Sequence, residues 1–203
     1  MNLSKWIDRD ALIAFAQRLV QTPSPSTQEG AVAVLLAEEM RHLGYDEVRV
    51  DAMGNVIGRI GPADGRKLLY NGHMDTVGIG EDAAWSHAPY GGEIADGVLY
   101  GRGAMDMKGA LAAMVYAGRA LKEGATPLHG AIYITAVVQE EPCEGAAMRH
   151  IVEQEGLRPD WVVIGEATNL QLARGQRGRI EMIIETRGRS CHASAPERGV
   201  NAI

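Results

Sequence analysis

The stretch KLLYNGHMD, residues 67–75, joins a short apolar strand to a histidine and an aspartate just beyond it. Side chains two residues apart in a strand share a face, so the carboxylate of Asp75 can orient the imidazole of His73. Metal-ligating histidines commonly have such a partner. A hydrogen-bonded His and Asp in a turn explains an isolated His-x-Asp equally simply, so the pair needs support from the rest of the chain.

Helical and strand-like segments alternate around this stretch. Apolar residues at helical spacing predict helices, whereas short β-type runs bounded by glycines predict strands. The helices are expected over residues 4–20, 31–43, 107–124 and 146–155, and the strands over 47–50, 56–60, 67–70, 131–139 and 161–164, with a β-rich stretch over 170–186. The alternation predicts an α/β fold, a three-layer sandwich with a mixed, mostly parallel sheet.

Ser26 and Glu29 precede the second helix with the spacing of a capping box. In that motif the two side chains satisfy backbone N–H groups at the start of the helix. We therefore expect both residues to cap the helix over 31–43.

The amino-acid composition argues against several classes of protein. The chain has 203 residues, 46% of them apolar and 23% charged, which suits a globular protein with a substantial core. Its net charge of −6 provides no basic surface for nucleic acid. Two cysteines without CxxC spacing, and no uninterrupted apolar run of about 18 residues, predict a cytoplasmic protein that does not span a membrane.

Acidic residues follow two more predicted strands and precede one helix. Glu140 and Glu141 follow the strand over 131–139, Glu166 follows the strand over 161–164, and Asp106 closes GRGAMD before a helix. A solvated acidic loop or, for Asp106, a helix N-cap would also explain each residue alone. Neither a Walker A loop nor a dinucleotide fingerprint fits GRGAMDMKG, because no Ser or Thr follows Lys108 and Asp106 stands where the third glycine belongs.

Ligand sites of open α/β sheets lie beyond the carboxyl ends of the strands, so these acidic residues and His73 can converge. An imidazole with several carboxylates suits zinc or a similar divalent ion, and a bridging carboxylate suits two ions about 3.5–4 Å apart. Of two adjacent glutamates, one can bind metal while the other accepts a proton from water.

The other histidines are weaker candidates for metal ligands. Four of them lack matching partners in the sequence and are expected at the surface or at helix ends: His42, His87, His129 and His150. His192 is flanked by small residues, but the adjacent Cys191 is a poor candidate nucleophile because adjacent residues seldom form a nucleophile and base pair. Arginines 174, 177 and 179 are either carboxylate binders or exposed side chains.

Five ordered motifs resemble the co-catalytic zinc aminoacylase and carboxypeptidase family, which includes acetylornithine deacetylase and succinyl-diaminopimelate desuccinylase. They are GHMDTV (72–77), GRGAMDMKG (101–109), QEE (139–141), GEAT (165–168) and SCHASAPERGVNAI (190–203). The stretches MVYAG, VQEEPCEG and RGQRGRIE are most similar to a subgroup of selenium-metabolism-linked hydrolases. The resemblance implies a zinc aminopeptidase-like catalytic domain over 1–178 and the start of a small α+β lid or dimerisation domain over 179–203.

The resemblance also implies roles for single residues. His73 and Glu166 would hold one zinc ion, Asp106 would bridge two, and Glu141 would hold the other, with cobalt or manganese as alternatives. Asp75 would orient His73, and Glu140 would act as the general base on the water between the ions. His192 would stabilise the oxyanion, in dimeric members from the opposite subunit. A cis peptide is expected at Asp106–Met107.

Two features depart from this family. Gln139 stands where an aspartate often precedes the paired glutamates. The family's last zinc ligand is a histidine far downstream, so we expect a truncated chain of weak or no activity. For the full-length protein we expect a homodimeric amidohydrolase acting on an N-acyl amino acid or short peptide. The alternative is a non-catalytic or vestigial domain that retains the fold.

Overall fold

The computed structural model describes residues 4–124, 127–143 and 145–203. It divides into two compact units, Met1–Ala167 and Thr168–Ile203. The α/β elements and the predicted site residues other than His192 all belong to the first unit. The predicted domain boundary after residue 178 stays a prediction.

A five-stranded mixed sheet forms the centre of the first unit. Its order is β1-β2-β6-β3-β7. The strands are β1 Glu47–Val50, β2 Val56–Ile60, β3 Arg66–His73, β6 Gly130–Val137 and β7 Trp161–Ile164. β3 pairs in parallel with β6 and β7, whereas β2 is antiparallel to β1 and β6. Four strands therefore run in one direction, which confirms the predicted mixed sheet.

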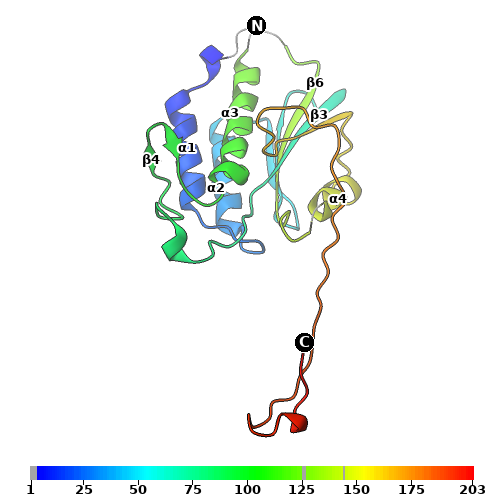
Figure 1. Cartoon of the computed structure of the whole chain (residues 1–203). Helices are drawn as coiled ribbons and strands as arrows, with labels where there is room; N and C mark the ends of the chain where they lie inside the picture. The colour runs from blue at the N-terminus through cyan, green and yellow to red at the C-terminus, as the bar shows by residue number, and fades with distance from the viewer. Residues whose placement is uncertain (1–3, 125–126, 144) are drawn as a thin grey trace. The chain divides into compact units, whose positions relative to one another are not determined.

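Helices cover both sides of this sheet, as Figure 1 shows. The helices α1 Arg9–Gln21, α2 Gly30–His42 and α3 Gly109–Glu123 lie on one side, and α4 Ala146–Glu153 lies on the other. The apolar faces of α1–α3 and the almost wholly buried strand β6 form the main core. The predicted α/β fold is confirmed, and none of the helices in the described residues is long and apolar enough to cross a membrane.

Three helix starts differ from the prediction, and one of them is that of α3, which begins at Gly109 rather than at residue 107. α1 begins at Arg9 because the carboxylate of Asp8 caps it, accepting the N–H of Ala11 at 3.0 Å. α2 begins at Gly30, and its N-cap residue Glu29 makes no side-chain capping bond. The predicted capping box is wrong, because Ser26 donates to the distant Asp75, and Glu29 accepts from Thr27 and from the distant Gln139.

Glycine brings α3 close to the end of β3. A Cβ atom at Gly72 would lie 2.6 Å from Met107 Cε and 3.0 Å from Leu111 Cδ2. Such contacts are shorter than a close-packed core tolerates. The absent side chain thus lets the beginning of α3 pack beside His73.

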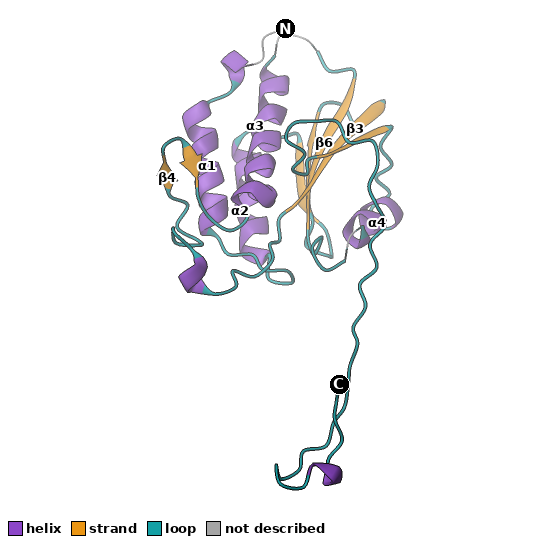
Figure 2. Cartoon of the chain, in the orientation of Figure 1, coloured by secondary structure: helices purple, strands orange, loops and turns teal. Residues whose placement is uncertain are grey.

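The second unit contains little regular structure. Residues 170–186, predicted to be β-rich, form no strand, and their apolar side chains Ile180, Met182 and Ile183 are exposed. Strand-forming residues need a partner strand for their backbone groups, and the described residues of this unit provide none for this segment. The unit has a bridge between Arg189 and Val200. Its short 3-10 helix, Pro196–Arg198, is the purple helix near the C-terminus in Figure 2.

Candidate metal centre

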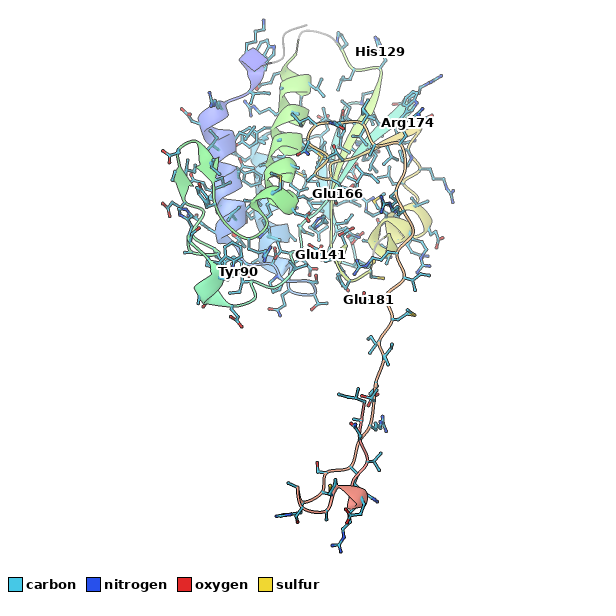
Figure 3. All side chains as sticks on the ribbon, viewed as in Figure 1. Tyr90, His129, Glu141, Glu166, Arg174 and Glu181 are labelled. Carbon is cyan, nitrogen blue, oxygen red and sulfur yellow. The ribbon has the colours of Figure 1, made fainter. Side chains whose placement is uncertain are left out.

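Three neighbouring parallel strands end at one edge of the sheet and deliver the predicted site residues there. His73 is the last residue of β3, Glu140 and Glu141 follow β6, and Glu166 follows β7. Figure 3 labels Glu141 and Glu166 on this part of the first unit. The fourth carboxylate, Asp106, comes from the turn Ala104–Lys108 before α3.

Asp106 lies inside an irregular turn rather than at a regular helix start. Gly103, with a φ of +80°, opens the turn, and the Asp106–Met107 peptide is cis, as the family resemblance implies. The N-cap position of α3 is Lys108, so the alternative N-cap role of Asp106 is not observed. The backbone N–H of His73 donates to Met107 Sδ at 3.2 Å and links the turn to β3.

His73 is 1% exposed and lies between two aspartates. Its Nδ1 lies 3.0 Å from the backbone carbonyl oxygen of Asp75 and 3.5 Å from Asp75 Oδ1. A carbonyl oxygen can only accept a hydrogen bond, so Nδ1 carries a hydrogen. The other ring nitrogen, Nε2, faces two further carboxylates of the site. Nε2 lies 2.8 Å from Asp106 Oδ1 and 3.6 Å from Glu166 Oε1.

The buried carboxylate of Asp75 organises the turn that carries the paired glutamates. Its Oδ1 accepts the N–H of Glu140 at 3.0 Å, and its Oδ2 accepts the N–H of Glu141 at 3.3 Å and the hydroxyl of Ser26 at 2.7 Å. Burial by itself would raise the pKa of Asp75, but these hydrogen bonds and His73 hold it below its ordinary value. Asp75 is therefore an anion that supports two strand ends.

Burial and the neighbouring charges shift the pKa values of the side chains in the site. Burial and the charge of Asp106 raise the pKa of Glu141, while nearby His73 lowers it. The same effects act on Glu166. Burial and the charges of Asp106 and Glu141 raise its pKa, and His73 lowers it. Burial of His73 opposes its protonation, yet its bonds to Asp75 and Asp106 raise its pKa to about 10. The carboxylates thus repel each other and attract a positive charge.

The residues present fit a divalent metal ion. His73 Nε2, one Asp106 oxygen and one Glu166 oxygen all lie within 4.8 Å of one another. An imidazole nitrogen and carboxylate oxygens are ligands that zinc and similar ions accept. Glu141 interacts electrostatically with both His73 and Asp106, which places a fourth donor beside this group.

Comparison with known proteins shows the family of this chain. The model of peptidase family M20/M25/M40 matches residues 69–193, more than half of the chain. The chain belongs to this family. It is 45% identical over 189 residues to the Escherichia coli K12 protein YgeY, described as uncharacterized, covering 93% of this chain and 47% of YgeY. It is 35% identical over 209 residues to a succinyl-diaminopimelate desuccinylase from Methylorubrum extorquens, covering 94% of this chain and 54% of that protein.

The M20 chain therefore spans about half the length of the curated relatives it matches. Among solved structures, an M20 family metallo-carboxypeptidase from Sulfolobus solfataricus, Sso-CP2, superposes with a TM-score of 0.66. That match covers 77% of this chain and 37% of Sso-CP2 at 24% identity, which shows a common fold.

Two predicted groups of this M20 chain lie in the second unit. His192 Nδ1 lies 2.8 Å from the hydroxyl of Ser194, and its part in the reaction stays a prediction. Arg174, Arg177 and Arg179 are exposed on the segment without strands. Their proposed contact with a substrate carboxylate is likewise a prediction.

Sequence reasoning missed a supporting residue of the centre, Glu29. This residue is 5% exposed, and its Oε1 accepts the N–H groups of Thr27 at 2.9 Å and Gln139 at 3.0 Å. Gln139 has a φ of 53°, so the chain turns sharply between β6 and Glu140. The sequence signal for this role was a glutamate directly before an apolar helix, but local helix capping explains the same pattern equally well.

Proposed function

We propose that this centre serves a metal-dependent amidohydrolase that cleaves the amide bond of an N-acyl amino acid or a short peptide. The observation that carries the proposal is the gathering of His73, Asp106 and Glu166 at one sheet edge, with the Glu140–Glu141 turn held beside them by Asp75. Family membership and the desuccinylase relative support a small acylated substrate.

The ligand roles follow from the donor atoms. His73 Nε2 and Glu166 would hold one ion, Asp106 would bridge two, and Glu141 would hold the second. Zinc is the ion we propose, because a nitrogen donor accompanies the oxygens. Bound metal would polarise the amide carbonyl and lower the pKa of a water molecule.

Glu140 is the proposed general base. Its backbone is fixed through the N–H bond to Asp75, and its neighbour Glu141 belongs to the ligand group. Glu140 would take the proton of the attacking water and deliver it to the leaving nitrogen, so that the amine departs neutral. His192 would stabilise the negative charge that develops on the carbonyl oxygen. We further propose a cytoplasmic enzyme that dimerises when full length.

Hydrolysis of a panel of N-acetyl amino acids, N-succinyl amino acids and dipeptides tests the proposal. The full-length, zinc-loaded protein is compared with its Glu140→Gln variant and with its Glu153→Gln variant, whose altered side chain is exposed on α4. We expect turnover that Glu140→Gln reduces at least about 100-fold and Glu153→Gln leaves unchanged. Activity that survives both Glu140→Gln and chelation would contradict the mechanism, and a zinc-loaded protein inactive on every substrate would favour a non-catalytic domain.

A further inference from the structure

A second cluster of metal-ligating side chains lies on another part of the first unit and shares no residue with the centre described above. Asp51 directly follows β1, His150 belongs to α4, and Glu155 follows the end of that helix. One ligand atom from each residue lies within 4.8 Å of the other two. Sequence analysis found no matching partner for His150 and expected it at the surface or at a helix end; the structure places it in the last turn of α4 with two carboxylates beside it.

His150 Nε2 is the atom that marks the cluster. It is buried, and no hydrogen-bond partner for it exists among the residues that the structure describes. Its distances to Asp51 Oδ2 and Glu155 Oε1 are 3.8 Å each, too long for hydrogen bonds. Buried polar atoms nearly always have a partner, and an unsatisfied one calls for a missing water or ion.

The spacing suits a shared cation. Zinc binds imidazole nitrogen and carboxylate oxygen at about 2.0–2.2 Å, which separates tetrahedral ligand atoms by roughly 3.3–3.6 Å. The observed distances of 3.8 Å require a contraction of only a few tenths of an ångström. A proton on Nε2 would still face two oxygens beyond hydrogen-bond reach, whereas a metal ion would engage all three atoms at once.

Neighbouring groups hold the two carboxylates in place. Asp51 Oδ1 accepts the backbone N–H groups of Met53 and Asn55, each at 2.9 Å, and Asp51 Oδ2 accepts from Asn55 Nδ2 at 2.7 Å. Arg49 binds Glu155 Oε2, which leaves Oε1 directed to His150. The arginine also reduces the negative charge of the cluster, so it moderates the attraction for a cation.

We propose that Asp51, His150 and Glu155 form a mononuclear divalent-metal site in which three protein ligands leave one position for water. A borderline ion such as zinc fits one nitrogen and two oxygen donors better than magnesium or calcium, which prefer oxygen alone. The bound ion would join the turn after β1 to the end of α4. This proposal does not depend on the proposed function.

Cadmium-113 NMR of the metal-free chain titrated with cadmium ions tests the site. We expect a resonance that is lost in His150→Gln and in Glu155→Gln but kept in Asp106→Asn, which alters the other centre. The control His129→Gln, which changes an exposed histidine, should keep it as well. Survival of every wild-type resonance in His150→Gln with a native circular dichroism spectrum would overturn the proposal.

A measurement on the unaltered chain covers the case in which His150→Gln does not fold. Histidine ring nitrogen NMR with added zinc should shift the Nε2 signal of His150 and leave that of His129 unchanged. An unshifted His150 signal at saturation of the other centre would show an ion pair with Asp51 and Glu155 only, which overturns the metal site.

Discussion

Asp75 Oδ1 accepts the backbone N–H of Glu140 at 3.0 Å, across 65 residues of sequence. Asp75 also contacts His73 through its carbonyl oxygen and accepts the N–H of Glu141. One residue therefore fixes the positions of both a proposed metal ligand on β3 and the proposed base after β6. Substituting Asp75 should therefore weaken metal binding more than the loss of a residue that only orients His73 would.

Asp75→Asn should weaken zinc binding by about 10–100-fold, because supporting partners of metal ligands typically contribute this much. The amide keeps one acceptor oxygen but loses the negative charge, and its NH2 group faces N–H donors. Competition with a chromophoric chelator measures the affinity. Asp64→Asn, on an exposed aspartate, is the control and should bind zinc as wild type does; equal affinities for both variants would contradict the argument.

Glu29→Ala should lower the free energy of unfolding by about 1–3 kcal/mol, because it leaves the N–H groups of Thr27 and Gln139 without their acceptor. Glu29→Gln retains an acceptor oxygen and should recover much of the loss. Urea unfolding measures both. Glu38→Ala, an exposed position on α2, should change stability by no more than a few tenths of a kcal/mol. A similar small change for Glu29→Ala would exclude the proposed support.

The stability of the metal-free chain should fall as pH rises from 6.5 through about 10. The pKa of His73 is raised from 6.5 to about 10, so its protonated form stabilises the fold fully below pH 6.5. That contribution is lost as pH rises through about 10. Urea unfolding in the presence of a chelator measures the slope. His73→Gln should flatten it over this window, and an unchanged slope would show that another group is responsible.

Gly72→Ala should destabilise the fold by about 1–3 kcal/mol, because its Cβ would meet Met107 Cε at 2.6 Å. Gly78→Ala is the matched control, since no atom lies within 4 Å of a Cβ there. Thermal unfolding should show a lower midpoint for the first variant only. Equal midpoints would mean that the start of α3 shifts away from β3 at little cost.

Much of the fold was predictable from local patterns. The strands over 47–50, 56–60 and 161–164 and the helix beginning at residue 146 appear where the apolar spacing predicts them. The gathering of His73, Glu141 and Glu166 could also be anticipated, because parallel neighbouring strands end at the same edge of a sheet. Residues 170–186 show the limit of such patterns, since strand-forming residues without a partner remain irregular.

The sequence alone determined which residue types stand at strand ends, and with them the charge and donor chemistry of the centre. Only the tertiary structure decided the partners of Ser26 and Glu29 and the two carboxylates that lie beside His150. Ser26 contacts Asp75 across 49 residues and Glu29 contacts Gln139 across 110. A local motif describes bonds within one turn of a helix, but a buried carboxylate binds the donors that folding brings to it, and these are known only when the strands have assembled.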